Sequence, residues 1–287
     1  MFSKRLSSWE LMQGPDMLLP TVSGLFIYPI KSCGGMAIEE GVIEERGFRH
    51  DRRWMVTDER GMFLTQREEP RLALAHASIA GEDIEVTAKG LMPVRMPLHW
   101  ADGESMSVEI WGQTVEAVRG PMEAEKWFKA LLGRTCRVVY MPDTSDRPMA
   151  VRDSPEGHRI AFSDAVPFLL ISEGSLDELN RRLDSPVPMN RFRPNIVVGG
   201  VEPHAEDRWK DVRIGGVKFE VLRPCSRCTT TTVDQDTGIR GVEPLRTLST
   251  YRRRGTKVMF GQNVIHRGLG MVRIGNELEV LSVRDFE

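Results

Sequence analysis

Two cysteines separated by two residues, Cys225 and Cys228, have the spacing in this sequence that points most directly to chemistry. Thiols three positions apart can share a metal ion, form a disulfide, or leave one thiolate as the lone ligand of a soft metal. Arg227 is adjacent to Cys228, and a positive charge near a thiol favours the thiolate. Spacing alone does not choose among these roles, and two small buried cysteines without a role are a further possibility.

A zinc site or a redox dithiol has little support around this pair. Structural zinc needs a second pair of Cys or His ligands. A thioredoxin-like dithiol begins a helix in βαβ context, whereas this pair lies between an expected strand at 217–222 and a β-branched run at 229–233, also an expected strand. The histidines offer no zinc-ligand spacing: His50, His76, His99, His158, His204 and His266.

Basic side chains near turns form a second group. Lysine, serine and arginine at strand ends suit a phosphate, because its oxygens accept charge-assisted hydrogen bonds from donors that converge from separate segments. Convergence is not visible in a sequence, and each residue taken alone is more simply an exposed cation. The group comprises Lys31 with Ser32, Arg52 with Arg53, and Arg191 with Arg193.

The segment 234–238, which reads Asp-Gln-Asp-Thr-Gly, could suggest a calcium loop. The closing glutamate of such a loop is missing, because Leu245 and Arg246 occupy the expected positions,. Turn chemistry is the better account. The chain also lacks a Gly-x-Ser-x-Gly nucleophile elbow and a glycine-rich phosphate loop ending in Lys-Ser or Lys-Thr,.

Composition limits the class of protein. The chain has 287 residues with 39 basic and 41 acidic side chains, a net charge of −2, so no long-range field favours nucleic acid or an anionic membrane,. Any anion site must therefore be local. No run approaches the roughly 20 apolar residues of a membrane span, and residues 1–20 read as a loose leader or short helix. Four scattered cysteines indicate a reducing compartment, most simply the cytoplasm,.

Short strands dominate the predicted elements that would position these residues. In the first half we expect strands at 25–30, 42–45, 53–57, 62–66, 84–87, 107–111 and 115–118, with turns at 58–61 and 111–113,. A helix is expected over 121–132, ended by Gly133, followed by a strand at 136–141. The polar segment 142–156 is typical of a surface connection between lobes.

The second half has the pattern of a β-barrel. We expect strands at 168–171, 195–198, 212–214, 217–222, 229–233, 271–274 and 278–281, with tight turns at Gly215 and Gly275,. Ser175 and Glu178 form a capping-box pattern that predicts the start of a helix. The sequence therefore predicts a β-rich α+β chain with domains at 22–141 and 142–284.

Taken in order, several segments resemble the MOSC family, named for the carboxy-terminal domain of molybdenum cofactor sulfurase. They most resemble its mitochondrial amidoxime-reducing components and their bacterial relatives, over about residues 24–281. The segments are Tyr-Pro-Ile-Lys-Ser-Cys at 28–33, Asp-Arg-Arg-Trp at 51–54, Glu-Pro-Arg at 69–71, Phe-Arg-Pro-Asn at 192–195, Cys-Ser-Arg-Cys at 225–228, Thr-Thr-Val-Asp at 231–234, Asp-Thr-Gly at 236–238 and Phe-Gly-Gln at 260–262.

The resemblance implies a MOSC-type β-barrel domain, an amino-terminal MOSC-type α+β domain, and a molybdenum cofactor, molybdopterin with Mo, in the cleft between them. By position, Cys228 would be the thiolate on the metal and Asp234 a further catalytic residue. The residues implied at the pterin and phosphate are Lys31, Ser32, Arg52, Ser163, Asp164, Ala165, Arg193, Asn195, Ser226, Arg227 and Asn263.

Three positions depart from the family pattern. Ala165 replaces a hydroxyl residue, so we expect any contact there to come from the main chain. Asn263 stands where a relative has Tyr, and Arg191 where that relative has Asn. The last two changes bear on substrate preference.

The resemblance further implies a reductase of small N-hydroxylated compounds, amidoximes and hydroxylamines. The chain has no Gly-x-Gly-x-x-Gly fingerprint and no four cysteines at iron–sulfur spacing,. We therefore expect electrons from a separate electron-transfer protein and its reductase. No ferredoxin-like domain or membrane anchor is expected. The alternative is a cofactor carrier or sulfur-handling protein without turnover, and a purely structural domain is the third possibility.

Overall fold

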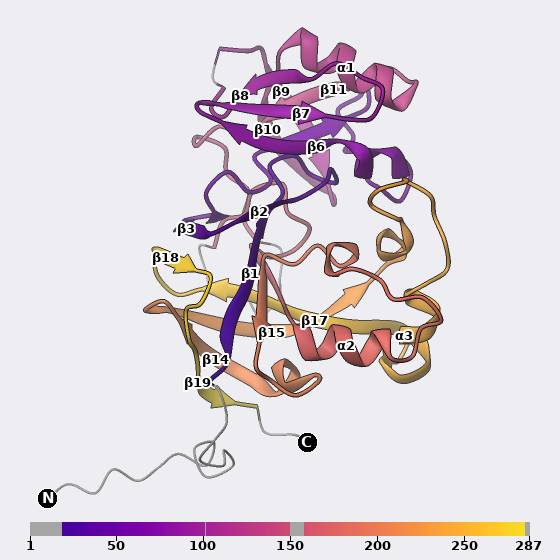
Figure 1. The fold of residues 1–287 in the computed structure, drawn as a ribbon. Helices are drawn as coiled ribbons and strands as arrows, with labels where there is room; N and C mark the ends of the chain where they lie inside the picture. Colours follow the sequence, from indigo (N-terminus) through magenta and orange to yellow (C-terminus); the bar gives the residue numbers. More distant parts are fainter. Residues whose placement is uncertain (1–18, 101, 150–157, 285–287) are drawn as a thin grey trace, which may run out of the picture.

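The computed structural model describes residues 19–100, 102–149 and 158–284. The expected leader at 1–20 therefore lies almost entirely outside the described residues, as does much of the connection at 142–156. In Figure 1 the strands β6 to β11 and helix α1 lie at the top, and β14, β15, β17 and β19 with α2 and α3 lie at the bottom. The two groups form an upper and a lower lobe, and the β-rich α+β prediction is confirmed.

A nine-stranded sheet forms the lower lobe. Its main path runs β19-β14-β15-β17-β12-β13-β1-β2, with the short β16 (Arg253–Arg254) paired to β17. All pairs are antiparallel except β12 with β13. The path consists of β1 (Thr21–Ile27), β2 (Met36–Ile38), β12 (Phe168–Ser172), β13 (Ile196–Gly199), β14 (Trp209–Ile214), β15 (Val217–Arg227), β17 (Lys257–His266) and β19 (Leu278–Val283).

The upper lobe has two smaller sheets and a helix. One sheet has the order β5-β11-β10-β9 and the other β6-β7-β8. Helix α1 (Met122–Leu132) buries Trp127 and Phe128 against the core and ends at Gly133 with φ 64°, as predicted,. The strands are β5 (Trp54–Thr57), β6 (His76–Ala80), β7 (Asp83–Thr87), β8 (Val94–Pro97), β9 (Ser105–Ile110), β10 (Gln113–Arg119) and β11 (Arg137–Tyr140).

The predicted hairpin at 111–113 is confirmed. Trp111 and Gly112 have φ of 53° and 76°, and positive φ at both central residues is what a type I′ hairpin turn requires,. Strands β9 and β10 pair antiparallel on either side of it. Residues 62–66, in contrast, form only isolated bridges and no strand.

Strand pairing crosses the expected domain division. Strands β1 and β2 belong to the lower sheet, and β3 (Glu40–Glu44) pairs with β18 (Gly270–Arg273) and with β4 (Gly47–Phe48). The first strands of the chain are therefore built into the lobe formed by its last strands. The division at 141 and 142 stays a prediction, but hydrogen bonding does not follow it at the amino-terminal end.

One predicted strand is wrong, and one predicted helix is confirmed with a different start. Residues 229–233 form the 3₁₀ helix η5 (Thr229–Thr232), because the Thr231 and Thr232 hydroxyls donate to the carbonyls three residues back, at 3.0 and 2.8 Å. Such local bonds compete with a strand ladder. Helix α2 (Glu173–Asn180) begins one turn early, because Ser172 rather than Ser175 is its N-cap.

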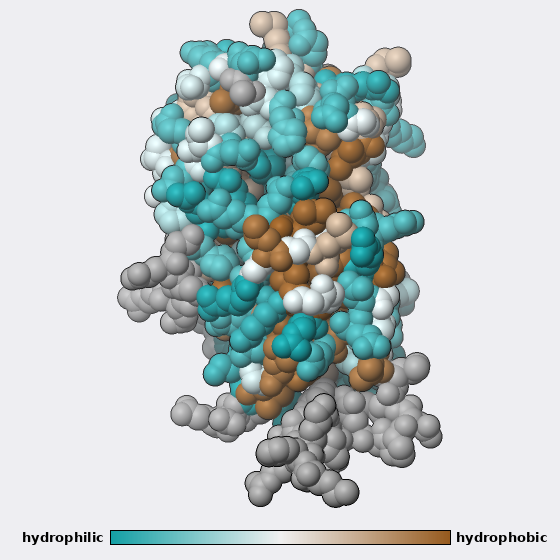
Figure 2. Space-filling model, turned by 90° about the vertical axis from the view of Figure 1, so that its left-hand side faces the viewer, coloured by the Kyte–Doolittle hydropathy of each residue, from teal (hydrophilic) through white to brown (hydrophobic). Residues whose placement is uncertain are grey.

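The remaining elements are short. They are α3 (Leu245–Tyr251) and the 3₁₀ helices η2 (Pro70–Leu74), η3 (Met189–Arg191) and η4 (Ala205–Arg208). Among the described residues, no helix has the length and apolar character needed to cross a membrane. Figure 2 shows the face at the left of Figure 1, where hydrophobic residues gather in the middle and lower part. Leu269 and Ile274, which flank β18, are 68% and 47% exposed.

Phe168 links the lower core to the strands contributed by the start of the chain. Its ring lies 4.8 Å from that of Phe48 and 5.6 Å from that of Phe219, and its side chain is buried. We predict that Phe168→Ala lowers the free energy of unfolding by about 3–5 kcal/mol in urea denaturation, because it leaves a cavity. The exposed Met92 is the control: Met92→Ala should change that energy by under about 0.5 kcal/mol,. Equal effects of the two would contradict this.

Candidate functional site

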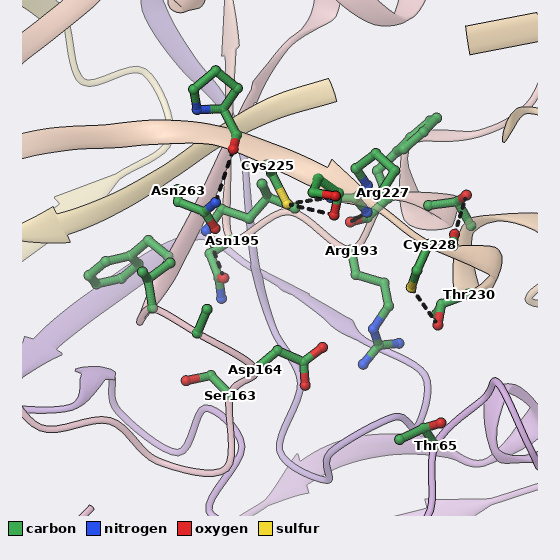
Figure 3. Close-up of a pocket in the computed structure, with 18 of the residues that line it drawn as sticks. Thr65, Ser163, Asp164, Arg193, Asn195, Cys225, Arg227, Cys228, Thr230 and Asn263 are labelled. Carbon is green, nitrogen blue, oxygen red and sulfur yellow. Dashed lines mark hydrogen bonds between the residues drawn. The ribbon is translucent and has the colours of Figure 1, made fainter. Parts of the chain in front are cut away.

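A cavity of about 390 Å³ opens between segments from both halves of the chain. Figure 3 shows Cys225, Arg227 and Cys228 on one wall, with Ser163 and Asp164 on another. The structure brings Cys228 together with all the residues that the resemblance implied at the cofactor. These lining residues are Lys31, Ser32, Arg52, Ser163, Asp164, Ala165, Arg193, Asn195, Ser226, Arg227, Cys228 and Asn263.

Lys31 is the cation at the base of this cavity. The residue follows β1, and its buried ammonium donates to the carbonyl of Phe162 at 2.8 Å and forms an ion pair with Asp164. The indole nitrogen of Trp111 donates to the same carboxylate at 3.1 Å. Burial lowers the pKa of Lys31 to about 8, although Asp164 opposes the shift. The charge of Lys31 is therefore sensitive to pH just above neutrality.

Arg52 and Arg193 share one aromatic ring. Their guanidinium carbons lie 4.7 and 4.2 Å from the ring centre of Tyr28,. Arg52 also forms an ion pair with Asp51 and donates to Asn195 at 3.0 Å. Among the described residues, Arg193 has no carboxylate within ion-pair distance, and one of its nitrogens donates to a main-chain carbonyl. Arg193 is thus the better placed of the two to bind an anion.

Backbone strain marks the same positions. Ser32, Arg52 and Arg193 have φ of 64°, 51° and 57°, the left-handed region that residues with a Cβ seldom adopt,. Such conformations cost about 1–3 kcal/mol each and cluster at functional sites. Three members of the predicted anion group therefore share a local conformation that packing alone would not favour.

The two thiols have different surroundings. Cys225 accepts a hydrogen bond from the Arg227 guanidinium at 3.2 Å, and Arg227 also donates to the carbonyl of Phe192 at 2.7 Å. The more exposed Cys228 contacts the Thr230 hydroxyl at 3.4 Å. The Arg227 guanidinium thus reaches back to Cys225, and its expected effect on Cys228 stays a prediction.

Irregular pairing directs this segment into the cavity. The register of β15 against β17 shifts between Val221 and Arg223 and again between Pro224 and Ser226. Bulges bend a strand and re-aim its side chains. Proline has no N–H to donate to the ladder, so within a sheet it is tolerated at a bulge, where the ladder is already interrupted. The side chains that follow Pro224 are therefore re-aimed toward the cavity, and pairing with β17 resumes at Ser226 and Arg227.

Arg191 fastens the turn that follows Cys228 and does not line the cavity. Its guanidinium donates to the carbonyls of Thr231 and Thr232 at 3.1 and 3.4 Å. It also donates to the carbonyl of Glu243 at 3.3 Å and to the Asp234 carboxylate at 2.9 Å. The expected place of Arg191 in the anion group is therefore corrected. Its influence on a substrate would be indirect.

Asp234 also lies outside the lining of the cavity. One of its oxygens accepts hydrogen bonds from the main chain of Asp236 and Thr237, and the other pairs with Arg191. This confirms turn chemistry at 234–238. The catalytic role implied for Asp234 stays a prediction, and the structure shows the carboxylate holding a turn.

Sequence reasoning missed several residues of the site. Arg147, in the segment expected to be a surface connection, is buried and donates to the carbonyls of Ala161 and Ser163 at 2.5 and 2.6 Å. It fixes the wall that carries Asp164. A polar run gives no signal for one buried arginine. Further lining residues without an advance signal include Thr65, Arg67, Arg223, Thr230 and Lys257.

Two buried polar atoms at this site lack partners. Ser163 Oγ and Arg227 Nε make no hydrogen bond with the residues that the structure describes. Buried polar groups are normally satisfied, so unpaired ones at a cavity indicate a missing ligand or water. No cluster of three or more His, Cys, Asp or Glu suited to a bare metal ion occurs among the described residues. A group that brings its own metal ligands fits this donor set better.

Comparisons with known proteins agree with this geometry. The model of the MOSC N-terminal beta barrel domain matches residues 19–135, and the model of the MOSC domain matches residues 157–279. Mitochondrial amidoxime-reducing component 1 of Mus musculus is 35% identical, over 91% of this chain and 82% of the mouse protein. The Homo sapiens protein of that name is 33% identical, over 91% and 83%. A molybdenum cofactor sulfurase of Oryza sativa is 32% identical, over 84% of this chain and 32% of its own length.

Removal of Arg191 should loosen the turn after Cys228. We predict that Arg191→Ala speeds amide hydrogen exchange in 229–243 about tenfold or more, because hydrogen bonds to a charged group each contribute about 1.5–3 kcal/mol. Mass spectrometry of the cofactor-free protein measures this. Arg182→Ala, which removes an exposed partner of Glu178, should leave 229–243 unchanged. Equal exchange of this segment in both variants would refute the assignment.

Anion binding should weaken as pH rises through about 8, the pKa of Lys31. The folded protein loses this cation above that pH, so affinity for sulfate should fall by up to about tenfold between pH 7 and 9. Sulfate keeps its charge across this range, and calorimetry on the cofactor-free protein measures its binding. Lys31→Arg stays cationic and should give a flatter profile. Parallel profiles for the two proteins would show that Lys31 does not contribute.

Proposed function

The chain belongs to the MOSC family, as its motifs predicted, and from that premise we propose that it is a molybdenum-cofactor-dependent reductase of N-hydroxylated compounds. The observation that carries the proposal is the exposed thiol of Cys228 at one wall of a cavity lined by cations from both lobes. Similarity to amidoxime-reducing components over more than 90% of the chain supports the choice of amidoximes and hydroxylamines as substrates.

The lining residues fit an anionic pterin with its own sulfur ligands. Arg193, Arg52 and Lys31 offer cations for the phosphate,. Ser163 Oγ and Arg227 Nε are buried polar atoms that such a ligand would satisfy. Cys228 would contribute the one protein thiolate, which a soft metal prefers to oxygen ligands. We assign the phosphate end to the base of the cavity near Lys31.

When bound, the cofactor supplies the two-electron chemistry that converts an N-hydroxyl group, with two protons, into an amine or amidine and water. The chain's own contribution is to hold and orient. Arg191 fixes the turn that follows Cys228, and Arg227 donates a hydrogen bond to the neighbouring thiol of Cys225. Trp111 and Lys31 hold the Asp164 carboxylate at the cavity wall.

Electrons would come from a separate protein. Cys33 and Cys136 are buried, far in sequence from the pair at the cavity, so the four thiols do not make an iron–sulfur relay,. We propose a small electron-transfer protein served by its own reductase as the donor. NADH alone should then fail to sustain turnover.

A carrier or sulfur-handling role is the second candidate. Two free cysteines line the same cavity, and Arg227 contacts the sulfur of Cys225. The similarity to molybdenum cofactor sulfurases agrees with this role but covers only a third of their length. Turnover of an N-hydroxylated substrate separates the two candidates.

The decisive measurement is amidoxime reduction by cofactor-loaded protein with reduced viologen as donor. We predict that Cys228→Ala abolishes turnover and lowers molybdenum content, since the metal loses its protein thiolate. The matched variant Cys225→Ala should keep much of both. NADH should support turnover only after a reductase and carrier are added. The reverse order of the two variants would overturn the ligand assignment, and inactivity of fully loaded wild type would favour the carrier role.

A further inference from the structure

The walls of the cavity carry a large excess of positive charge. Asp164 is the single carboxylate among its described lining residues, in a chain whose net charge is −2. Walls of one sign attract ligands of the opposite sign and exclude others. The lining cations number seven: Lys31, Arg52, Arg67, Arg193, Arg223, Arg227 and Lys257.

Four of these cations already have a carboxylate partner or a predicted role in cofactor binding. Lys31 and Arg52 have carboxylate partners, and Arg193 and Arg227 belong to the predicted cofactor group. The other three are Arg67, Arg223 and Lys257. Arg67 stacks on Trp111, with its guanidinium 4.5 Å from the ring centre. None of the three forms an ion pair with any residue that the structure describes, so their charge is free for a ligand.

Lys257 is the one placed beside Cys228. It begins β17, and the next residue, Val258, pairs with Arg227 on β15. The antiparallel register, continued by one residue past the end of β15, would bring Cys228 level with Lys257, and both residues line the cavity,. Arg223 pairs with Asn263 instead, and Figure 3 shows Asn263 on the far side of the cavity from Cys228.

No carboxylate in the part of the chain that the structure describes forms an ion pair with Lys257. Near this hairpin the Asp207 side chain is 9% exposed, and its carboxylate binds Arg252 and Gln262, each at 2.6 Å. Arg254, which pairs with Lys257 in the ladder, lies 3.9 Å from the same Asp207 carboxylate, so this acid is already shared by two arginines. The end of the cavity next to Cys228 is therefore positively charged and exposed, whatever occupies the base.

We propose that the substrate is an anionic N-hydroxylated compound, whose carboxylate or phosphate group is held by Lys257 while its N-hydroxyl group lies at Cys228. This inference rests on the proposed reductase function and specifies its substrate class. A neutral amidoxime leaves Lys257 unpaired, and a cationic one is repelled. Lysine presents a single flexible charge, which suits an acidic group without demanding bidentate geometry.

A matched series of substrates tests this with one electron donor. Loaded protein and reduced viologen are given benzamidoxime or its 4-carboxylate, 4-phosphonate or 4-trimethylammonium derivative, and kcat/KM is compared within each variant. The better of the two anions should exceed the neutral compound by about threefold to fivefold, the range of an exposed ion pair, and the cation should fall below it. High salt should reduce these ratios, because screening weakens exposed pairs.

Three variants locate the preference. Lys257→Met should bring the anion-to-neutral ratio close to one, and Lys257→Arg should keep it. Lys89→Met is the control, since Lys89 is an exposed lysine of the upper lobe outside the cavity. Wild-type ratios near one would overturn the substrate class. A ratio that survives Lys257→Met would overturn the role of Lys257, and Arg223→Met would then identify the alternative.

The outcome can be separated from failure of the proposed function. If loaded wild type reduces none of the four compounds, the reductase proposal fails and the substrate ratios cannot be formed. Calorimetry with benzoate then tests the anion site without turnover. Binding that weakens threefold or more in Lys257→Met but not in Lys89→Met would support Lys257 as the anion-binding residue. Equal binding in both would refute it.

Discussion

Positive charge held close to positive charge is the constraint on which the site depends. Arg52 and Arg193 stack on the single ring of Tyr28, and two cations so placed repel each other unless opposite charges or dipoles compensate,. Asp51 compensates the first and the carbonyl of Cys33 the second. The compensation is incomplete at Arg193, and a bound anion would complete it. Affinity for an anion thus follows from the charge arrangement itself.

This arrangement requires both ends of the chain. Strand β1 is built into the lower sheet through β13, and the residues directly after it then turn toward the upper lobe, where Lys31 donates its main-chain N–H to the carbonyl of Trp54. The opposite wall comes from the end of β15, where its register against β17 shifts. Neither half alone would form the cavity, so the site requires both lobes in place.

The sequence predicted those elements whose structure depends on neighbouring residues. The amphipathic pattern and Gly133 predicted helix α1, and the Trp-Gly pair at 111 predicted its hairpin. The family motifs predicted the cofactor group that lines the cavity, but they also implied Asp234, which lies outside it. Residues whose role depends on distant partners gave no such signal: Arg147 binds carbonyls in another segment, and Arg191 reaches the turn at 231–243. The run Thr229–Thr232 was predicted to be a strand from its β-branched residues. It forms a 3₁₀ helix instead, because threonine hydroxyls donate to carbonyls within the turn.

The left-handed backbone at Ser32, Arg52 and Arg193 costs stability at positions that the cavity needs. Glycine adopts this conformation without strain, so at each position a smaller residue would relax the fold while removing a polar contact of the cavity. Selection for thermal robustness alone would therefore erode the site. Side chains at all three strained positions therefore indicate a requirement for binding, and the main-chain angles alone are enough to show where it lies.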